Sequence, residues 1–133
     1  MNNRAQPTNG QQYKILTFDE LDGGLGAPSI RSARGTLPEV LVAPVVRYLD
    51  SGVLFLRDDE ECADVFDLDA GPDRDLSLVT DGDWIWRRMV SYYVREYRCG
   101  LDERFVEIAM RSIAADKAKV DLREARRWWN NHR

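Results

Sequence analysis

The sequence predicts an α+β domain in which a small antiparallel sheet, built on a central hairpin, packs against three to four helices. Two observations predict this class. Residues 76–86 have the pattern of a strand, a tight turn and a second strand. From residue 87 the spacing of apolar residues changes from every second residue to about every 3.6 residues. A length of 133 residues with 44% apolar content suits one core. We therefore expect a flexible N-terminal arm over residues 1–12 and a single domain over residues 13–133.

The hairpin is the most specific local signal. Asp81-Gly82 is typical of a two-residue turn in which both positions take a positive φ. Trp84 and Trp86 share one face of the returning strand, because side chains alternate along a strand. A helix over residues 87–99 should follow directly, so this stretch predicts the centre of the fold.

Before the hairpin, residues 13–18 alternate well enough for a short strand. Residues 19–35 are rich in glycine, which predicts a loop. Gly23-Gly24-Leu25-Gly26 lacks the Gly-Lys-Ser/Thr ending of a phosphate-binding loop and a later glycine at dinucleotide-binding spacing. We interpret it as a connection.

A helix over residues 37–50 is predicted next, with Thr36 as its N-cap. Pro44 lies inside the pattern and should kink or divide the helix. The apolar run over residues 53–56 predicts a buried central strand.

Two further helices are expected after the hairpin helix, over residues 102–116 and 121–130. In the last one, Leu122, Ala125 and Trp129 share an inner face and Trp128 lies off it. We expect all four helices to cover one face of a sheet of three to five strands.

The net charge of −4 is unevenly distributed. Residues 1–86 sum to −9 and residues 87–133 to +5, so the acidic part and the basic helical part either neutralise each other or face different partners. No apolar run is long enough to span a membrane and no secretory signal is visible, which favours a cytoplasmic protein. Cys62 and Cys99 are expected as free thiols.

The acidic part is concentrated in residues 58–75. One base, Arg74, stands there against nine carboxylates: Asp58, Asp59, Glu60, Glu61, Asp64, Asp67, Asp69, Asp73 and Asp75. Such a run is either a solvated loop that protects the sheet from edge pairing or a surface that meets a basic partner.

The sequence contains no clear pattern of catalytic or metal-binding residues. His132 is the single histidine and lies one residue from the chain end, where we expect fraying and no positioned base. Two distant cysteines do not complete a zinc site. Asp67 and Asp69 lack the bidentate glutamate of an EF-hand. We predict no catalytic residue, no metal and no cofactor, while an enzyme using carboxylates and tyrosines in a hidden pocket stays open.

Aromatic and basic residues also lie together around the hairpin helix, as in proteins that bind single-stranded nucleic acid. Trp86, Tyr93 and Tyr97 share the apolar stripe of this region, so we expect their side chains in the core. The basic face defines an alternative nucleic-acid site of four residues: Arg87, Arg88, Arg95 and Arg98. The overall acidity counts against it.

The order of features resembles small uncharacterised bacterial proteins of the actinobacterial type. The resemblance covers about residues 45–108. It rests on five stretches: Tyr48-Leu49-Asp50-Ser51-Gly52, the apolar strand Val53 to Leu56, Asp64-Val65, Thr80-Asp81-Gly82-Asp83-Trp84-Ile85-Trp86 and Tyr92-Tyr93-Val94-Arg95-Glu96-Tyr97. Arg87 departs from the proline expected after the second tryptophan. In style these proteins are similar to immunity proteins of bacterial toxin systems.

The resemblance and the acidic run together imply a non-enzymatic binding protein, an immunity protein that masks the active site of a basic toxin domain. A regulatory or nucleic-acid-associated protein that uses the basic C-terminal helices is the alternative. No membrane partner is expected. The predicted partner-binding residues are Asp58, Asp59, Glu60, Glu61, Asp64, Asp67 and Asp69.

Overall fold

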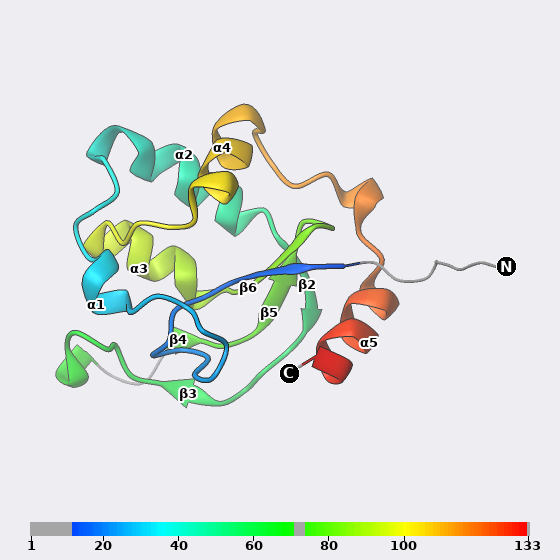
Figure 1. Ribbon diagram of the computed structural model, residues 1–133, viewed down its shortest axis with the longest axis horizontal. Coiled ribbons are helices and arrows are strands. Elements are labelled where there is room, and N and C mark those ends of the chain that lie inside the picture. The colour runs from blue at the N-terminus through cyan, green and yellow to red at the C-terminus, as the bar shows by residue number, and fades with distance from the viewer. Residues whose placement is uncertain (1–11, 71–73, 133) are drawn as a thin grey trace, which may run out of the picture.

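The computed structural model describes residues 12–70 and 74–132 (Figure 1). The predicted arm over residues 1–12 lies outside this part of the chain, apart from its last residue. In chain order the elements are β1 (Lys14–Leu16), α1 (Ile30–Ala33), α2 (Glu39–Asp50), β2 (Val53–Leu56), β3 (Glu61–Cys62), the 3-10 helix η3 (Leu68–Ala70), β4 (Arg74–Asp75), β5 (Leu78–Thr80), β6 (Trp84–Arg87), α3 (Met89–Tyr97), α4 (Glu103–Arg111), the 3-10 helix η4 (Lys117–Lys119) and α5 (Leu122–His132).

The α+β class is confirmed, with the hairpin of β5 and β6 at the centre of a four-stranded sheet ordered β1-β6-β5-β2. The sheet is mixed, whereas we expected an antiparallel one, because β1 pairs with β6 in parallel. The chain from β1 to β6 includes two helices and four strands, so no tight turn forces the two to run in opposite directions. A separate two-stranded sheet joins β3 and β4.

The turn of the hairpin differs in detail from its prediction. Thr80 pairs with Ile85, and only Gly82 takes a positive φ, of 102°. Asp81 contributes its side chain instead. Its carboxylate accepts hydrogen bonds from the backbone N–H groups of Asp83 at 2.9 Å and Trp84 at 2.8 Å. The turn is therefore closed by an aspartate side chain and one glycine.

Helices cover both faces of the four-stranded sheet, which corrects the expectation of one covered face (Figure 1). Trp84 and Trp86 share one face, as predicted, and pack among residues of α2, α3 and α4. Ile85 points to the other face, where α5 packs. Trp128 and Trp129 of α5 are both buried there in one cluster with Ile85, which corrects the expectation that Trp128 lies off the inner face of the helix.

The helix of residues 39–50 runs through Pro44 without a break. The proline removes only the hydrogen bond to the carbonyl of Val40, a residue that is 80% exposed and whose carbonyl can meet water. Thr36 is not the N-cap; its hydroxyl donates to the carbonyl of Ala33 at 2.6 Å. Pro38 occupies the N-cap position.

Three more expectations are corrected. A short helix, α1, lies in the predicted loop and is capped by the side chain of Ser29. The predicted central strand, β2, is an edge strand, because only β5 pairs with it. The helix expected to reach residue 116 ends at Arg111, since Ser112 turns extended and leaves Ile113 75% exposed.

Candidate functional site

The predicted partner-binding residues lie in the chain between β2 and β4. We call residues 58–70 the acidic segment. In Figure 1 this segment leaves the lower end of the sheet, passes through β3 and reaches η3 at the edge of the molecule. Two polar clusters, one around Arg87 and one around Asp64, connect it to the rest of the fold.

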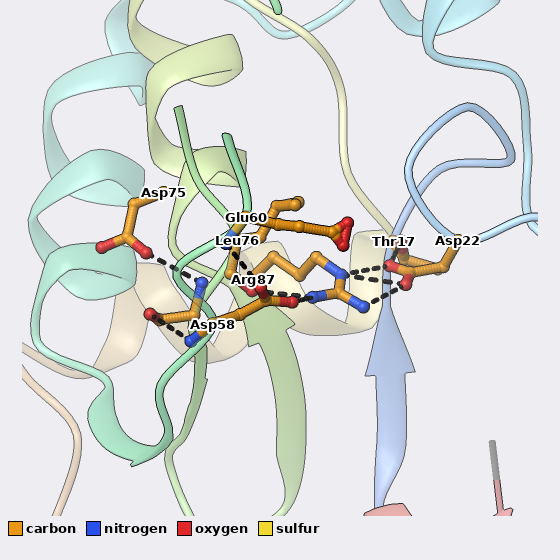
Figure 2. Close-up of polar contacts among 8 residues, drawn as sticks. Thr17, Asp22, Asp58, Glu60, Asp75, Leu76 and Arg87 are labelled. Atoms are coloured by element: carbon orange, nitrogen blue, oxygen red, sulfur yellow. Dashed lines mark hydrogen bonds and ion pairs between the residues drawn. The ribbon is translucent and has the colours of Figure 1, made fainter. Parts of the chain in front are cut away.

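The first cluster is centred on Arg87, at the end of β6 (Figure 2). Its Nε donates to both carboxylate oxygens of Asp22, at 2.9 and 3.1 Å, and its Nη1 donates to the carbonyl of Leu76 at 2.7 Å. The Thr17 hydroxyl donates to the same aspartate at 2.6 Å. Asp58 completes the cluster, with its carboxylate 3.6 Å from Arg87 Nη1.

This cluster fixes the start of the acidic segment. The backbone N–H of Asp58 donates to the hydroxyl of Ser77 at 3.0 Å, and the N–H of Glu60 donates to the Asp58 carboxylate at 2.9 Å (Figure 2). Ser77 in turn donates its N–H to Asp75 at 2.8 Å. Burial acts to raise the pKa of Asp75, but hydrogen bonds from Ser77 and Arg88 outweigh it and hold the pKa below its usual value.

The second cluster surrounds the carboxylate of Asp64, which has no exposed surface. It accepts hydrogen bonds from the hydroxyl of Tyr92 at 2.5 Å, the hydroxyl of Tyr97 at 2.6 Å and the backbone N–H of Phe66 at 2.7 Å. Burial alone would raise the pKa of Asp64, but these donors favour the ionised form and the net pKa is lowered. An ionised carboxylate therefore joins the acidic segment to α3.

Aromatic contacts close this second cluster. The backbone N–H of Val65 donates to the hydroxyl of Tyr93 at 2.9 Å, and burial raises the pKa of that tyrosine to about 12. The rings of Phe66 and Tyr97 lie 4.7 Å apart between centroids. The guanidinium of Arg34 lies over both rings, at 4.7 and 4.8 Å from their centroids. The middle of the acidic segment is thus packed between α1 and α3.

The seven predicted partner-binding residues differ in exposure, because some of them belong to the two clusters and others do not. Asp64 faces inward and is corrected from a surface contact to a buried anchor, and Asp58 is half-buried beside Arg87. Glu61 lies in β3. Four residues are exposed, and no lysine or arginine of the described chain lies within ion-pair distance of them: Asp59, Glu60, Asp67 and Asp69. Sequence patterns do not separate the two groups, because all seven are acidic residues in one run.

The four arginines of the alternative nucleic-acid site all make contacts with other groups of the chain. Arg87 is bound within the first cluster, with a side chain only 14% exposed. The other three are exposed and each contacts an acceptor in the chain: Arg88 with Asp75 at 3.4 Å, Arg95 with Glu96 at 3.2 Å and Arg98 with the Gly35 carbonyl at 3.2 Å. Binding of a phosphate at these positions would compete with those contacts. The nucleic-acid alternative stays a prediction.

The side chains that could hold a metal ion or carry catalysis are the carboxylates, His132 and the two cysteines. In residues 12–70 and 74–132 no three His, Cys, Asp or Glu side chains lie close enough to hold a metal ion. His132 is the last residue of α5, and its ring stacks on that of Trp128 with the ring centroids 4.3 Å apart. Both cysteines are free thiols, as predicted, and burial raises the pKa of Cys99 to about 11.

No protein-family model matches the chain, and no curated protein or solved structure is significantly similar to it. The resemblance to bacterial immunity proteins therefore stays a prediction. Within the described residues, no helix combines the length and the apolar character that crossing a membrane requires.

Proposed function

We propose that this protein is a non-enzymatic binding protein whose acidic segment docks on a basic protein partner. In its most specific form the proposal is an immunity protein that masks the active site of a bacterial toxin. The observation that supports it is the arrangement of Asp59, Glu60, Asp67 and Asp69. These carboxylates are exposed and make no ion pair within the described chain, while the backbone that carries them is held in place.

The anchoring matters for binding because ordering a loop costs free energy on association. Asp58 is held to Ser77 and Arg87, and Asp64 is held to Tyr92 and Tyr97. Less of the ordering cost therefore remains when a partner binds. The segment is suited to present charge in one geometry, which an unanchored acidic loop would not do.

The charges themselves act mainly on encounter and selectivity. Exposed carboxylates attract a basic surface over about 8 Å at physiological ionic strength, which speeds association, and they repel acidic competitors. Leu68 lies between Asp67 and Asp69 and is 76% exposed, so an apolar side chain is available within the charged surface. A basic cleft with an apolar floor is the complementary shape.

Affinity capture is the first experiment. Tagged full-length protein is exposed to native lysate at low salt, and retained proteins are identified by mass spectrometry. We expect one stoichiometric partner with a basic surface that elutes as salt rises. Recovery of only acidic or neutral partners, with no salt dependence, would contradict the proposal.

Charge neutralisation then locates the surface. The test variant replaces three carboxylates by amides: Asp59→Asn, Glu60→Gln and Asp69→Asn. A matched control removes three exposed charges elsewhere: Glu39→Gln, Asp116→Asn and Asp121→Asn. We expect the test variant to associate about tenfold more slowly with less salt dependence, and the control to bind as the parent does. Both should unfold within about 0.5 kcal/mol of the parent. Equal weakening in both variants would remove the acidic segment as the binding surface.

A further inference from the structure

We propose that the groove beside β1 binds an extended peptide segment of a partner protein, apolar and basic in character, by adding it as a strand to the sheet. The groove has a volume of about 1080 Å³ and lies between β1, the chain around α1 and the first turns of α2 and α4. It shares no lining residue with the acidic segment, so the inference stands without the proposed function.

The backbone of β1 supplies the first requirement. Lys14 donates its N–H to the carbonyl of Asp83 at 2.9 Å, which places its backbone groups on the β6 side. Because backbone groups alternate along a strand, those of Ile15 and Thr17 point to the opposite side, where both residues line the groove. β1 is the edge of the sheet, and no described strand pairs with its outer side. An extended peptide can pair with such an edge.

Apolar walls supply the second requirement. Leu25, which is 42% exposed, lines the groove together with the half-buried Leu41 and Val106. Alternate side chains of an added strand would pack between these residues. Trp128 lines the groove as well, and its buried indole N–H has no hydrogen-bond partner in the described chain. The indole nitrogen itself is enclosed, so Trp128 contributes the apolar surface of its ring to this end of the groove.

Charge decides the kind of peptide. Three carboxylates line the wall formed by α4, and the lining contains no lysine or arginine. Asp102 is paired with Arg104 at 2.8 Å, whereas Glu103 and Glu107 are exposed and have no ion-pair partner in the described chain. A peptide with a lysine or arginine beside its apolar residues would complement this wall.

The test begins with a display library of random nonapeptides, selected on the full-length protein. The strongest peptide is resynthesised and titrated into ¹⁵N-labelled protein. We expect it to alternate apolar residues with lysine or arginine, and to shift the amides of Ile15 and Thr17. One indole N–H signal should move, and Trp128→Phe should remove that signal. N-methylation of alternate peptide amides should weaken binding at least about tenfold, because strand addition uses those amides.

Two matched double variants test whether the carboxylates of the groove contribute to peptide affinity. Glu103→Gln/Glu107→Gln should weaken peptide binding about three- to tenfold. Asp59→Asn/Glu60→Gln removes the same charge from the acidic segment and should leave peptide affinity unchanged. Failure to enrich any peptide, or shifts confined to the acidic segment, would overturn the inference. So would a concentration-dependent dimer that shifts the same amides without peptide, because a second copy would then cover the groove. None of these outcomes counts against the acidic segment as a docking surface, and shifts confined to that segment would support it.

Discussion

Replacing Asp64 by alanine is the most informative perturbation of this protein. The side chain has no exposed surface and accepts hydrogen bonds from two tyrosine hydroxyls and one backbone N–H. Alanine removes the acceptor and leaves three donors facing a small cavity. The change acts on the anchor of the acidic segment and leaves the exposed carboxylates in place.

The expected loss follows from these contacts. A hydrogen bond to a charged group contributes about 1.5–3 kcal/mol, and desolvation of the carboxylate offsets part of the sum. Tyr92 and Tyr97 are half-buried, so their hydroxyls can turn toward water in the variant. We therefore expect Asp64→Ala to lower the free energy of unfolding by about 3 kcal/mol. Asp64→Asn keeps one acceptor oxygen and should cost about half as much.

Urea unfolding followed by tryptophan fluorescence measures this loss. All four tryptophans are buried in the core and none lies in the acidic segment, so their fluorescence reports unfolding of the whole domain. Hydrogen exchange of the Val65 and Phe66 amides reports the local anchor, since both donate to groups of the second cluster. Asp69→Ala, at an exposed carboxylate, serves as the control and should stay within about 0.5 kcal/mol. An Asp64→Ala protein as stable as this control, with unchanged exchange, would refute the reasoning.

The same carboxylate predicts a pH dependence. The folded-state pKa of Asp64 is below its usual value, so the unfolded chain takes up the proton first as the pH falls. Its stabilisation is complete above the unfolded pKa of about 3.9 and is lost as the pH drops through the lower folded pKa. The difference in unfolding free energy between the parent and Asp64→Ala should therefore narrow below about pH 3.9.

Three further predictions concern the surrounding structure. Arg87→Met leaves two carboxylates without their cation and should cost about 3 kcal/mol in urea unfolding, whereas Arg95→Met, at an exposed pair, should cost less than about 0.5 kcal/mol. Gly52→Ala would bring a Cβ within 2.6 Å of an indole carbon and should lower the free energy of unfolding by about 2 kcal/mol; a stability equal to the parent would show that the neighbouring side chains shift freely. Burial and a pKa of about 11 should keep Cys99 unreactive toward a thiol reagent at pH 8, while the half-buried Cys62 reacts, so that one thiol titrates in the native protein and two after unfolding.

Local sequence determined the elements whose cause lies within a few residues. The alternation through Trp84 and Trp86 and the glycine at position 82 define the hairpin without help from the rest of the chain. The 3.6-residue period that follows defines α3. The α+β class, the four longer helices and the strands β1 and β2 were predicted for this reason.

Tertiary structure decided the strand directions, the placement of the helices and the burial of single residues, which local sequence patterns do not determine. The sequence did not indicate that β1 would run parallel to β6, or that α5 would cover the opposite face, because both depend on how distant segments meet. The same holds for the acidic run. Asp64 and Asp69 have the same chemistry and similar neighbours in sequence, yet one is enclosed by the tyrosines of α3 and the other faces solvent. Burial comes from contacts between residues far apart in the chain, and a residue's own neighbours in sequence do not encode those contacts.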